Sequence, residues 1–251
     1  MSFYNCFFSP TGGTKKVADT VASGWEVPFT PVDLLQEAPA IQFTAEDVCL
    51  FAVPSYGGRV PAPVAEQVRK WDGNGCHAVL IAVFGNRAID DTLLELSDLL
   101  TDAGFRCTAA VEAVAQHSLL PKFGAGRPDA GDLAELHSFG QSIADSYHAG
   151  ILSHQLHLPG NRPYRKYDGV PLKPSVASGC IACGRCAEEC PVGAIPLTNV
   201  RTTDRKKCIS CMHCVAICPK HVRHVSKLLS AVAAAGMRKT CSERKPNKLY
   251  L

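Results

Sequence analysis

The sequence has no hydrophobic run long enough to cross a membrane. The longest apolar segment, Cys76 to Phe84, contains His77 and falls far short of the roughly 20 residues that a spanning helix needs. The N-terminal segment MSFYNCFFSP has no basic residue ahead of its apolar stretch, so it lacks the pattern of a secretory signal peptide. These absences predict a soluble, cytoplasmic protein with no integral membrane segment.

A strong charge of one sign is also lacking. Lys plus Arg number 26, Asp plus Glu number 23, and 46% of the residues are hydrophobic. Such a balanced composition excludes disordered, fibrous and strongly polyelectrolyte classes of protein. A length of 251 residues, against about 150 per domain, predicts one large domain or two small ones.

The small net charge conceals a division along the chain. Residues 1–150 contain 9 basic and 18 acidic residues, a net charge of −9, and residues 151–251 contain 17 and 5, a net charge of +12. This asymmetry indicates two units with different partners. Residues 150–175 between them contain four prolines and three glycines without a periodic pattern, which predicts a linker or wrapping segment.

In the first unit, apolar runs of strand length alternate with segments of helical periodicity. Continuous apolar strands are typical of a parallel sheet covered on both faces. We therefore predict a doubly wound α/β sheet, in which ligands bind beyond the carboxyl ends of the strands. The predicted strands are 3–8, 27–33, 48–53, 78–84 and 107–115, and the predicted helices begin at Thr14, at Pro63, at an Asp90 or Asp91 cap, and at Gly131.

Three segments that follow predicted strands have the composition of ligand-binding loops. Ser9 to Thr14, SPTGGT, combines hydroxyl groups, two glycines and a helix start, which suits a phosphate. The segments PSYGGRVP at 54–61 and FGNR at 84–87 offer an aromatic ring, backbone amides and a positive charge. Taken singly, each of the three also has the composition of an ordinary surface turn.

The three segments together resemble those of flavodoxins, over residues 1–149. The resemblance implies a five-stranded sheet in the order 2-1-3-4-5 that binds FMN without a covalent bond. Arg87 departs from the family pattern, and it either lies near the flavin N1 edge or pairs with Asp90 or Asp91. The resemblance implies that the phosphate is bound by Ser9, Thr11, Gly12, Gly13 and Thr14. It also implies that one side of the isoalloxazine is flanked by Ser55, Tyr56, Gly57 and Gly58, and the other side by Phe84, Gly85, Asn86 and Arg87.

A patternless stretch follows the last predicted strand, over residues 116–130. Ordered stretches of this length are often functional, and this one is expected at the same edge of the sheet as the flavin. His117 within it is expected to be a structural histidine rather than a proton donor.

Eight of the 13 cysteines form two copies of one motif, C-x2-C-x2-C-x3-C-P, which begin 28 residues apart. Thiolates at this spacing suit an iron–sulfur cluster, and the fourth cysteine of each run reaches the other cluster. Zinc is the alternative, although zinc ribbons favour two separated C-x2-C pairs.

The motif is similar to that of bacterial two-cluster ferredoxins, over residues 176–226, and implies a small α+β domain. By that pattern, one [4Fe–4S] cluster is held by Cys180, Cys183, Cys186 and Cys218, and the other by Cys208, Cys211, Cys214 and Cys190. Residues 227–251 are then a basic tail, with an alanine-rich helix expected over 224–237 that packs on its own chain.

The whole chain resembles the flavodoxin–ferredoxin fusion proteins of anaerobic bacteria and archaea. That resemblance implies an electron carrier, rather than an enzyme, which passes electrons between FMN and two [4Fe–4S] clusters and exchanges them with redox partner proteins. Two other functions are compatible with the sequence: a flavin-dependent reductase of a small molecule, and a redox-sensing regulator that acts through the basic tail. The tail lacks interleaved aromatic residues, so we expect no nucleic-acid partner.

Overall fold

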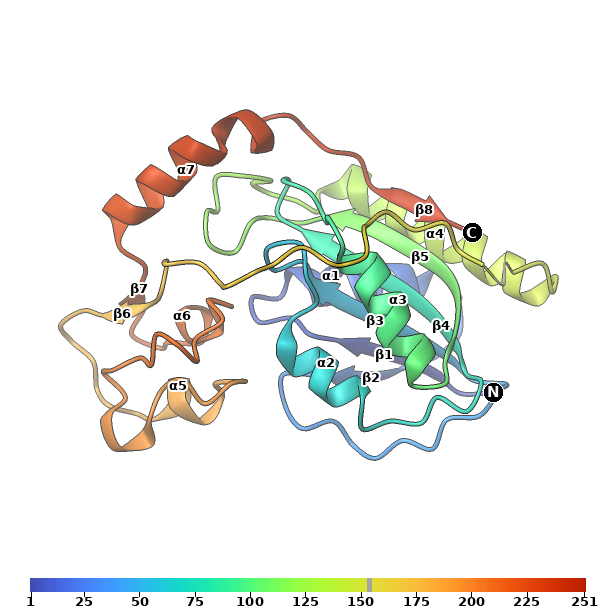
Figure 1. Ribbon diagram of the computed structural model, residues 1–251, viewed down its shortest axis with the longest axis horizontal. Coiled ribbons are helices and arrows are strands. Elements are labelled where there is room, and N and C mark those ends of the chain that lie inside the picture. Colours follow the sequence, from blue (N-terminus) through green and yellow to red (C-terminus); the bar gives the residue numbers. More distant parts are fainter. Residues whose placement is uncertain (153–154) are drawn as a thin grey trace.

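The computed structural model describes residues 1–152 and 155–251. Its main sheet has the strand order β2-β1-β3-β4-β5-β8, and a second sheet pairs β6 with β7 (Figure 1). The five predicted strands run parallel in the predicted order 2-1-3-4-5, so the first unit has the flavodoxin-like topology. The elements of this unit are β1 (Phe3–Phe7), α1 (Gly13–Ser23), β2 (Thr30–Asp33), β3 (Val48–Pro54), α2 (Ala62–Val68), β4 (His77–Phe84), α3 (Thr92–Asp102), β5 (Arg106–Val114) and α4 (Ala130–His148).

Both faces of the main sheet are buried, as continuous apolar strands require. Successive residues of β3 show this, because Leu50 belongs to the hydrophobic cluster beneath α1 and α4, and Phe51 to the cluster beneath α2 and α3. Helices α1 and α4 pack unusually closely, since a Cβ atom at Gly140 would lie 2.0 Å from the carbonyl oxygen of Val21. This contact lies at the C-terminal end of α1, whereas near its start Lys16 Nζ donates to the carbonyl oxygen of Pro128 at 3.0 Å.

The second unit follows the linker and is small. It contains β6 (Ser175–Val176), α5 (Arg185–Glu188), the 3-10 helix η1 (Leu197–Asn199), α6 (His213–Ala216) and β7 (Arg223–His224). The final helix, α7 (Lys227–Cys241), runs back toward the main sheet above the 116–130 segment (Figure 1). As predicted, α7 packs on its own chain, with Ala234 and Cys241 against Leu120 and Phe123.

The chain ends with a strand that the sequence pattern did not predict. Strand β8 (Lys248–Tyr250) pairs antiparallel with β5, so the predicted five-stranded sheet gains a sixth strand. Ion pairs hold this tail, because Arg244 contacts Asp129 at 2.8 Å and Asp132 at 2.9 Å. The basic tail therefore docks on the acidic first unit of its own chain.

The linker crosses the outer side of α3 (Figure 1). Asp91 occupies the N-cap position of α3, but its carboxylate does not cap the helix as predicted. It accepts instead from the backbone N–H groups of Asn161, at 2.9 Å, and Arg165, at 2.7 Å. The segment is thus a wrap that is fastened to the first unit.

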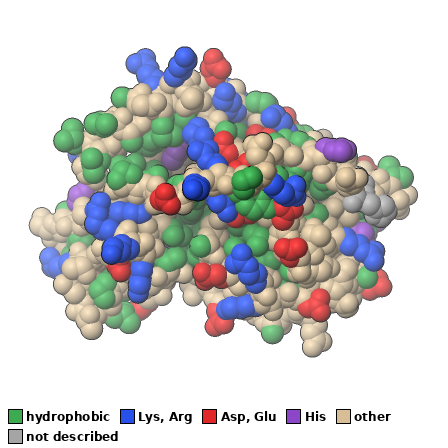
Figure 2. Space-filling model, in the orientation of Figure 1, with side chains coloured by type: hydrophobic (Ala, Val, Ile, Leu, Met, Phe, Trp, Pro, Cys, Tyr) green, Lys and Arg blue, Asp and Glu red, His purple; other side chains and the backbone are tan. Residues whose placement is uncertain are grey.

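Acidic side chains are concentrated on the first unit. On the face drawn in Figure 2 most of them lie over the main sheet and its helices, whereas Lys and Arg side chains lie both over α5, α6 and α7 and over the first unit. Within the described residues, no helix has both the length and the apolar character that a membrane span requires.

Candidate functional site

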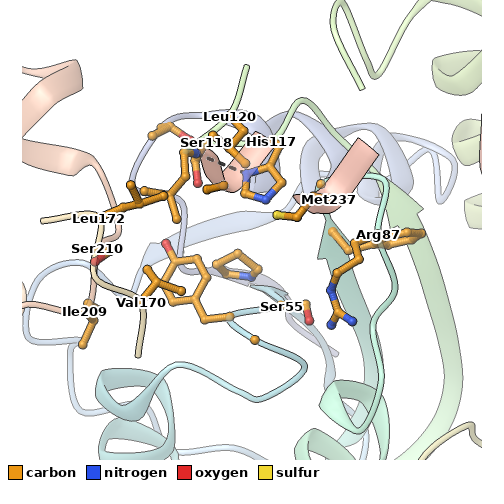
Figure 3. Close-up of a pocket in the computed structure, with 18 of the residues that line it drawn as sticks. Ser55, Arg87, His117, Ser118, Leu120, Val170, Leu172, Ile209, Ser210 and Met237 are labelled. Atoms are coloured by element: carbon orange, nitrogen blue, oxygen red, sulfur yellow. Dashed lines mark hydrogen bonds between the residues drawn. The ribbon is translucent and has the colours of Figure 1, made fainter. Parts of the chain in front are cut away.

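A cavity of about 600 Å³ lies at the carboxyl ends of β1, β3 and β4 (Figure 3). Its volume falls in the range of about 300–1,000 Å³ that is usual for cofactor and small-molecule sites. All three candidate loops contribute to its wall. Of the residues that the flavodoxin resemblance assigns to FMN, those that line the cavity are Thr11, Gly13, Thr14, Ser55, Tyr56, Gly57, Phe84, Gly85 and Arg87.

The SPTGGT loop has the geometry of an anion site. Gly12 is the N-cap of α1 with φ +86°, a conformation that favours glycine. The Ser9 hydroxyl accepts from the N–H of Lys15 at 2.8 Å, so it fixes the loop from outside the cavity lining. Gly13 and Thr14 face the cavity from the first turn of α1, whose N–H groups have no acceptor within the helix.

The second loop is covered by the linker. A Cβ atom at Gly57 would lie 2.1 Å from the ring of Tyr167, so only glycine lets the ring pack there. The Ser55 hydroxyl is engaged inside the protein, since it accepts from Thr92 Oγ1 at 2.8 Å. Gly58 lies behind the cavity wall, against Asp90.

In the third loop, Asn86 is engaged with the C-terminal tail through its side chain. Its side chain leaves the cavity wall and binds the tail, because Nδ2 donates to the carbonyl oxygens of Cys241, at 2.6 Å, and Glu243, at 2.8 Å. Its Oδ1 accepts from the N–H of Lys245 at 3.1 Å. Arg87 lines the cavity and pairs with Asp90, which is one of the two arrangements that the sequence left open.

His117 lies against the third loop and faces the cavity near Met237 (Figure 3). A Cβ atom at Gly85 would lie 2.6 Å from the Cβ atom of His117. Burial, with a smaller contribution from the charge of Arg87, lowers the pKa of His117 to about 4. The ring is therefore neutral near pH 7. Its Nδ1 accepts from the N–H of Leu119 at 3.2 Å, which leaves the hydrogen on Nε2.

Three segments of the second half of the chain also line the cavity. The linker contributes Tyr167, Val170 and Leu172, and α7 contributes Leu229, Val232 and Met237. The third contribution is Ile209 and Ser210, which lie between two of the motif cysteines. No sequence motif predicted that these residues would line the cavity, because they reach it only when the second half of the chain folds back on the first unit.

The first set of four cysteines surrounds a small hollow of its own. Cys180, Cys183, Cys186 and Cys218 all line it, as the cross-over pattern of the two motifs predicts. Partial burial raises the pKa of the Cys218 thiol, but backbone N–H groups of residues 220–223 outweigh this and lower it. Such N–H···S bonds stabilise a thiolate and tune the potential of a cluster that it binds.

The second set is also gathered together. Burial, with smaller contributions from the nearby Cys214, Cys190 and Cys208 thiols, raises the pKa of Cys211 to about 12. Backbone N–H groups lie near two sulfur atoms, since Ala194 N is 3.3 Å from Cys190 Sγ and Ser210 N is 3.4 Å from Cys208 Sγ. Within the part of the chain that the structure describes, no three His, Cys, Asp or Glu residues are placed to share a single metal ion.

His213 links the second set to the first unit. It precedes Cys214 in α6, and its Nδ1 lies 2.9 Å from the carbonyl oxygen of Pro10 in the SPTGGT loop. Its Nε2 lies 3.2 Å from Glu189 Oε2, next to Cys190. No sequence pattern singled out this histidine, because its role depends on the docking of the two units.

Comparison with known proteins bears first on the second unit. A family model described as a 4Fe-4S dicluster domain matches residues 179–222. One protein of the ion-translocating oxidoreductase complex of Methanosarcina acetivorans is 45% identical over 58 residues, which make up 22% of this chain and 22% of that protein. The chain thus spans about a fifth of the length of this curated relative. The second unit is a ferredoxin-type domain of the 4Fe–4S class.

Solved structures that resemble the chain include flavodoxins. One from the domain Archaea is 14% identical, covering 59% of this chain and 99% of its own, with a TM-score of 0.41. The two-electron reduced flavodoxin of Megasphaera elsdenii is 15% identical in sequence, and the match covers 58% of this chain and 99% of that flavodoxin, with a TM-score of 0.37. A flavone reductase is 12% identical in sequence, and the match covers 64% of this chain and 66% of that enzyme, with a TM-score of 0.44. The strand order of the main sheet, and not these likenesses, carries the assignment of a flavodoxin-like fold.

Proposed function

We propose that this chain passes electrons, one at a time, between FMN held by the first unit and two [4Fe–4S] clusters held by the second. One observation carries the proposal. A single cavity is lined both by the flavin-type loops and by Ile209 and Ser210, which lie between Cys208 and Cys211. Cofactors in adjoining sites of one chain exchange electrons at a high effective concentration.

The residues of the cavity fit FMN. The first turn of α1 offers N–H groups and the Thr11 and Thr14 hydroxyls to a phosphate. Tyr56 and Gly57 offer a flat surface on one side, and Phe84 and Gly85 offer one on the other. The buried hydroxyl of Ser210 has no hydrogen-bond partner among the described residues, as expected for a group that a ligand completes. When bound, FMN supplies exchange of either one or two electrons.

The two cysteine sets fit clusters. Cys180, Cys183, Cys186 and Cys218 would hold one, and Cys190, Cys208, Cys211 and Cys214 the other. The backbone N–H groups near the sulfur atoms of Cys190, Cys208 and Cys218 suit thiolates, which are the form that binds iron. The oxidoreductase complex that the matching relative belongs to supports a role in electron transfer with redox partner proteins.

Analysis of cofactor content tests this proposal. The chain would be purified without oxygen, and its iron, sulfide and FMN would be quantified on one sample together with its visible spectrum. We expect about eight iron, eight sulfide and one FMN per chain. Zinc in place of iron would contradict the electron-transfer function, and full iron without FMN would leave a ferredoxin with a docking domain.

A second candidate function, reduction of a small molecule, is favoured by the lining of the cavity. The linker and α7 supply apolar side chains, and the neutral ring of His117 presents its Nε2–H beside them. A planar quinone such as menadione, which takes up two electrons and two protons, is a suitable probe. Saturable oxidation of the reduced chain by menadione, slowed at least tenfold in His117→Gln, would support this candidate. A rate that rises linearly with menadione and is equal in both proteins would exclude it.

A further inference from the structure

The two cysteine motifs differ at a position that faces the flavin cavity. Each begins with the same pattern, Cys180-Ile181-Ala182-Cys183 and Cys208-Ile209-Ser210-Cys211. Ile181 is 58% exposed, whereas its counterpart Ile209 packs against the hydrophobic core of the first unit and lines the cavity. The repeat is therefore symmetric in sequence, and only its second copy faces the first unit.

Within these first four residues, the copies differ only at Ser210, which takes the place of Ala182. Its φ of +57° matches the +53° of Ala182, so the backbone takes the same left-handed conformation without help from a hydroxyl group. Ser210 is 3% exposed and lines the cavity, and its Oγ has no partner among the described residues (Figure 3). Leaving a buried hydroxyl unpaired is unfavourable, so this group requires a partner that the described residues do not supply.

Other contacts place the second set of cysteines beside the flavin loops. Tyr56 of the second loop and Ile209, which follows Cys208, line the same cavity and pack against the same hydrophobic cluster. His213, next to Cys214, hydrogen-bonds to Pro10 in the first loop. The first set is turned outward instead, since Cys183 is exposed.

From this asymmetry we propose an order for the redox centres, which rests on the function proposed above. The cluster of Cys190, Cys208, Cys211 and Cys214 exchanges electrons with the flavin, to which Ser210 hydrogen-bonds. The outward cluster of Cys180, Cys183, Cys186 and Cys218 exchanges them with an external one-electron redox protein. Each step moves one electron, which one centre loses and the next gains, and no bond is made or broken.

The repeat supplies a matched pair of variants, Ser210→Ala and Ala182→Ser. Both are made in the full chain, and FMN affinity and the midpoint potential of the flavin are measured without oxygen. Loss of one hydrogen bond is expected to weaken FMN binding about three- to tenfold in Ser210→Ala and to shift the flavin potential. Ala182→Ser is expected to change neither. Equal behaviour of the two variants, or a shift confined to a cluster potential in Ser210→Ala, would overturn the assignment of Ser210.

A second pair tests the order of the clusters. Cys183→Ala and Cys214→Ala each remove one ligand, and an iron content near four per chain identifies variants that keep the other cluster. After photochemical injection of an electron, redistribution between flavin and cluster is expected to persist in Cys183→Ala and to be lost in Cys214→Ala. The opposite pattern would reverse the order. If the wild-type chain itself lacked FMN or iron, the proposed function would fail, whereas failure confined to these variants concerns the order alone.

Discussion

The Nδ1 atom of His213 lies 2.9 Å from the carbonyl oxygen of Pro10. On the other side of the ring, Nε2 lies 3.2 Å from Glu189 Oε2. His213 precedes Cys214, Glu189 precedes Cys190, and Pro10 belongs to the loop expected to hold the FMN phosphate. One imidazole therefore ties the phosphate loop to two segments that carry the second cysteine set, and it fixes how the two units meet.

Replacing this histidine is expected to loosen the contact between the units. His213→Ala removes both hydrogen bonds, which stabilise the docked arrangement by about 1–3 kcal/mol. Hydrogen exchange would then rise in residues 9–14 and 185–190, measured on samples of equal iron content. His213→Asn can still donate to Pro10 and is expected to fall between the two. Unchanged exchange in His213→Ala would show that other contacts hold the units together.

Asn86 is expected to govern stability more than cofactor binding. Asn86→Ala removes the hydrogen bonds that the side chain makes with two carbonyl oxygens and one N–H group of the tail. We expect a loss of about 2–4 kcal/mol in the free energy of unfolding, seen as a lower anaerobic melting temperature. FMN affinity should change less than threefold as long as the chain is folded. A large loss of FMN affinity at unchanged stability would instead support the role that the flavodoxin resemblance assigns to Asn86.

Alanine variants of Gly57 and Gly126 distinguish the effect of backbone strain from the effect of side-chain packing. Both have positive φ, +62° and +77°, but a Cβ atom at Gly57 would meet the Tyr167 ring, whereas one at Gly126 would meet nothing within 4 Å. Either alanine variant costs about 1 kcal/mol in backbone conformation. Only Gly57→Ala is expected to displace Tyr167 from the cavity wall and weaken FMN binding about tenfold or more. Equal FMN affinities of the two variants, measured by flavin fluorescence, would show that Tyr167 does not shape the site.

His117 gives the protein a pH dependence of known sign. Its folded pKa of about 4 lies below the unfolded value of about 6.5, so between these values only the unfolded chain binds the proton. Stability therefore falls as the pH drops from about 6.5 toward 4, by about 1–3 kcal/mol. His117→Gln is expected to flatten this part of the profile of melting temperature against pH. A profile that keeps its fall between pH 6.5 and 4 in His117→Gln would show that burial of this ring does not cause the loss of stability.

Much of the fold could be predicted because its signals are local. The apolar runs predict β3 and β4, and the cysteine spacing predicts the second unit. Strand β8 was missed because three residues carry no periodic pattern, and their pairing depends on the free edge of β5. Asp91 has the sequence of a helix cap, yet the linker takes its carboxylate. Ser210 and His213 occupy variable positions of a cysteine motif, so the sequence does not single them out. Docking of the two units brings His213 to Pro10, and it buries Ser210 Oγ without a partner among the described residues.

The most direct test of the central claim is the order of the electron-transfer reaction between flavin and clusters. One electron would be injected photochemically into the anaerobic full chain, and the flavin and cluster absorbances would be followed over a tenfold range of protein concentration. Transfer within one chain predicts a first-order rate that does not change with concentration. A rate proportional to concentration would mean that electrons pass between molecules, and it would contradict the proposal that one chain joins the two kinds of cofactor.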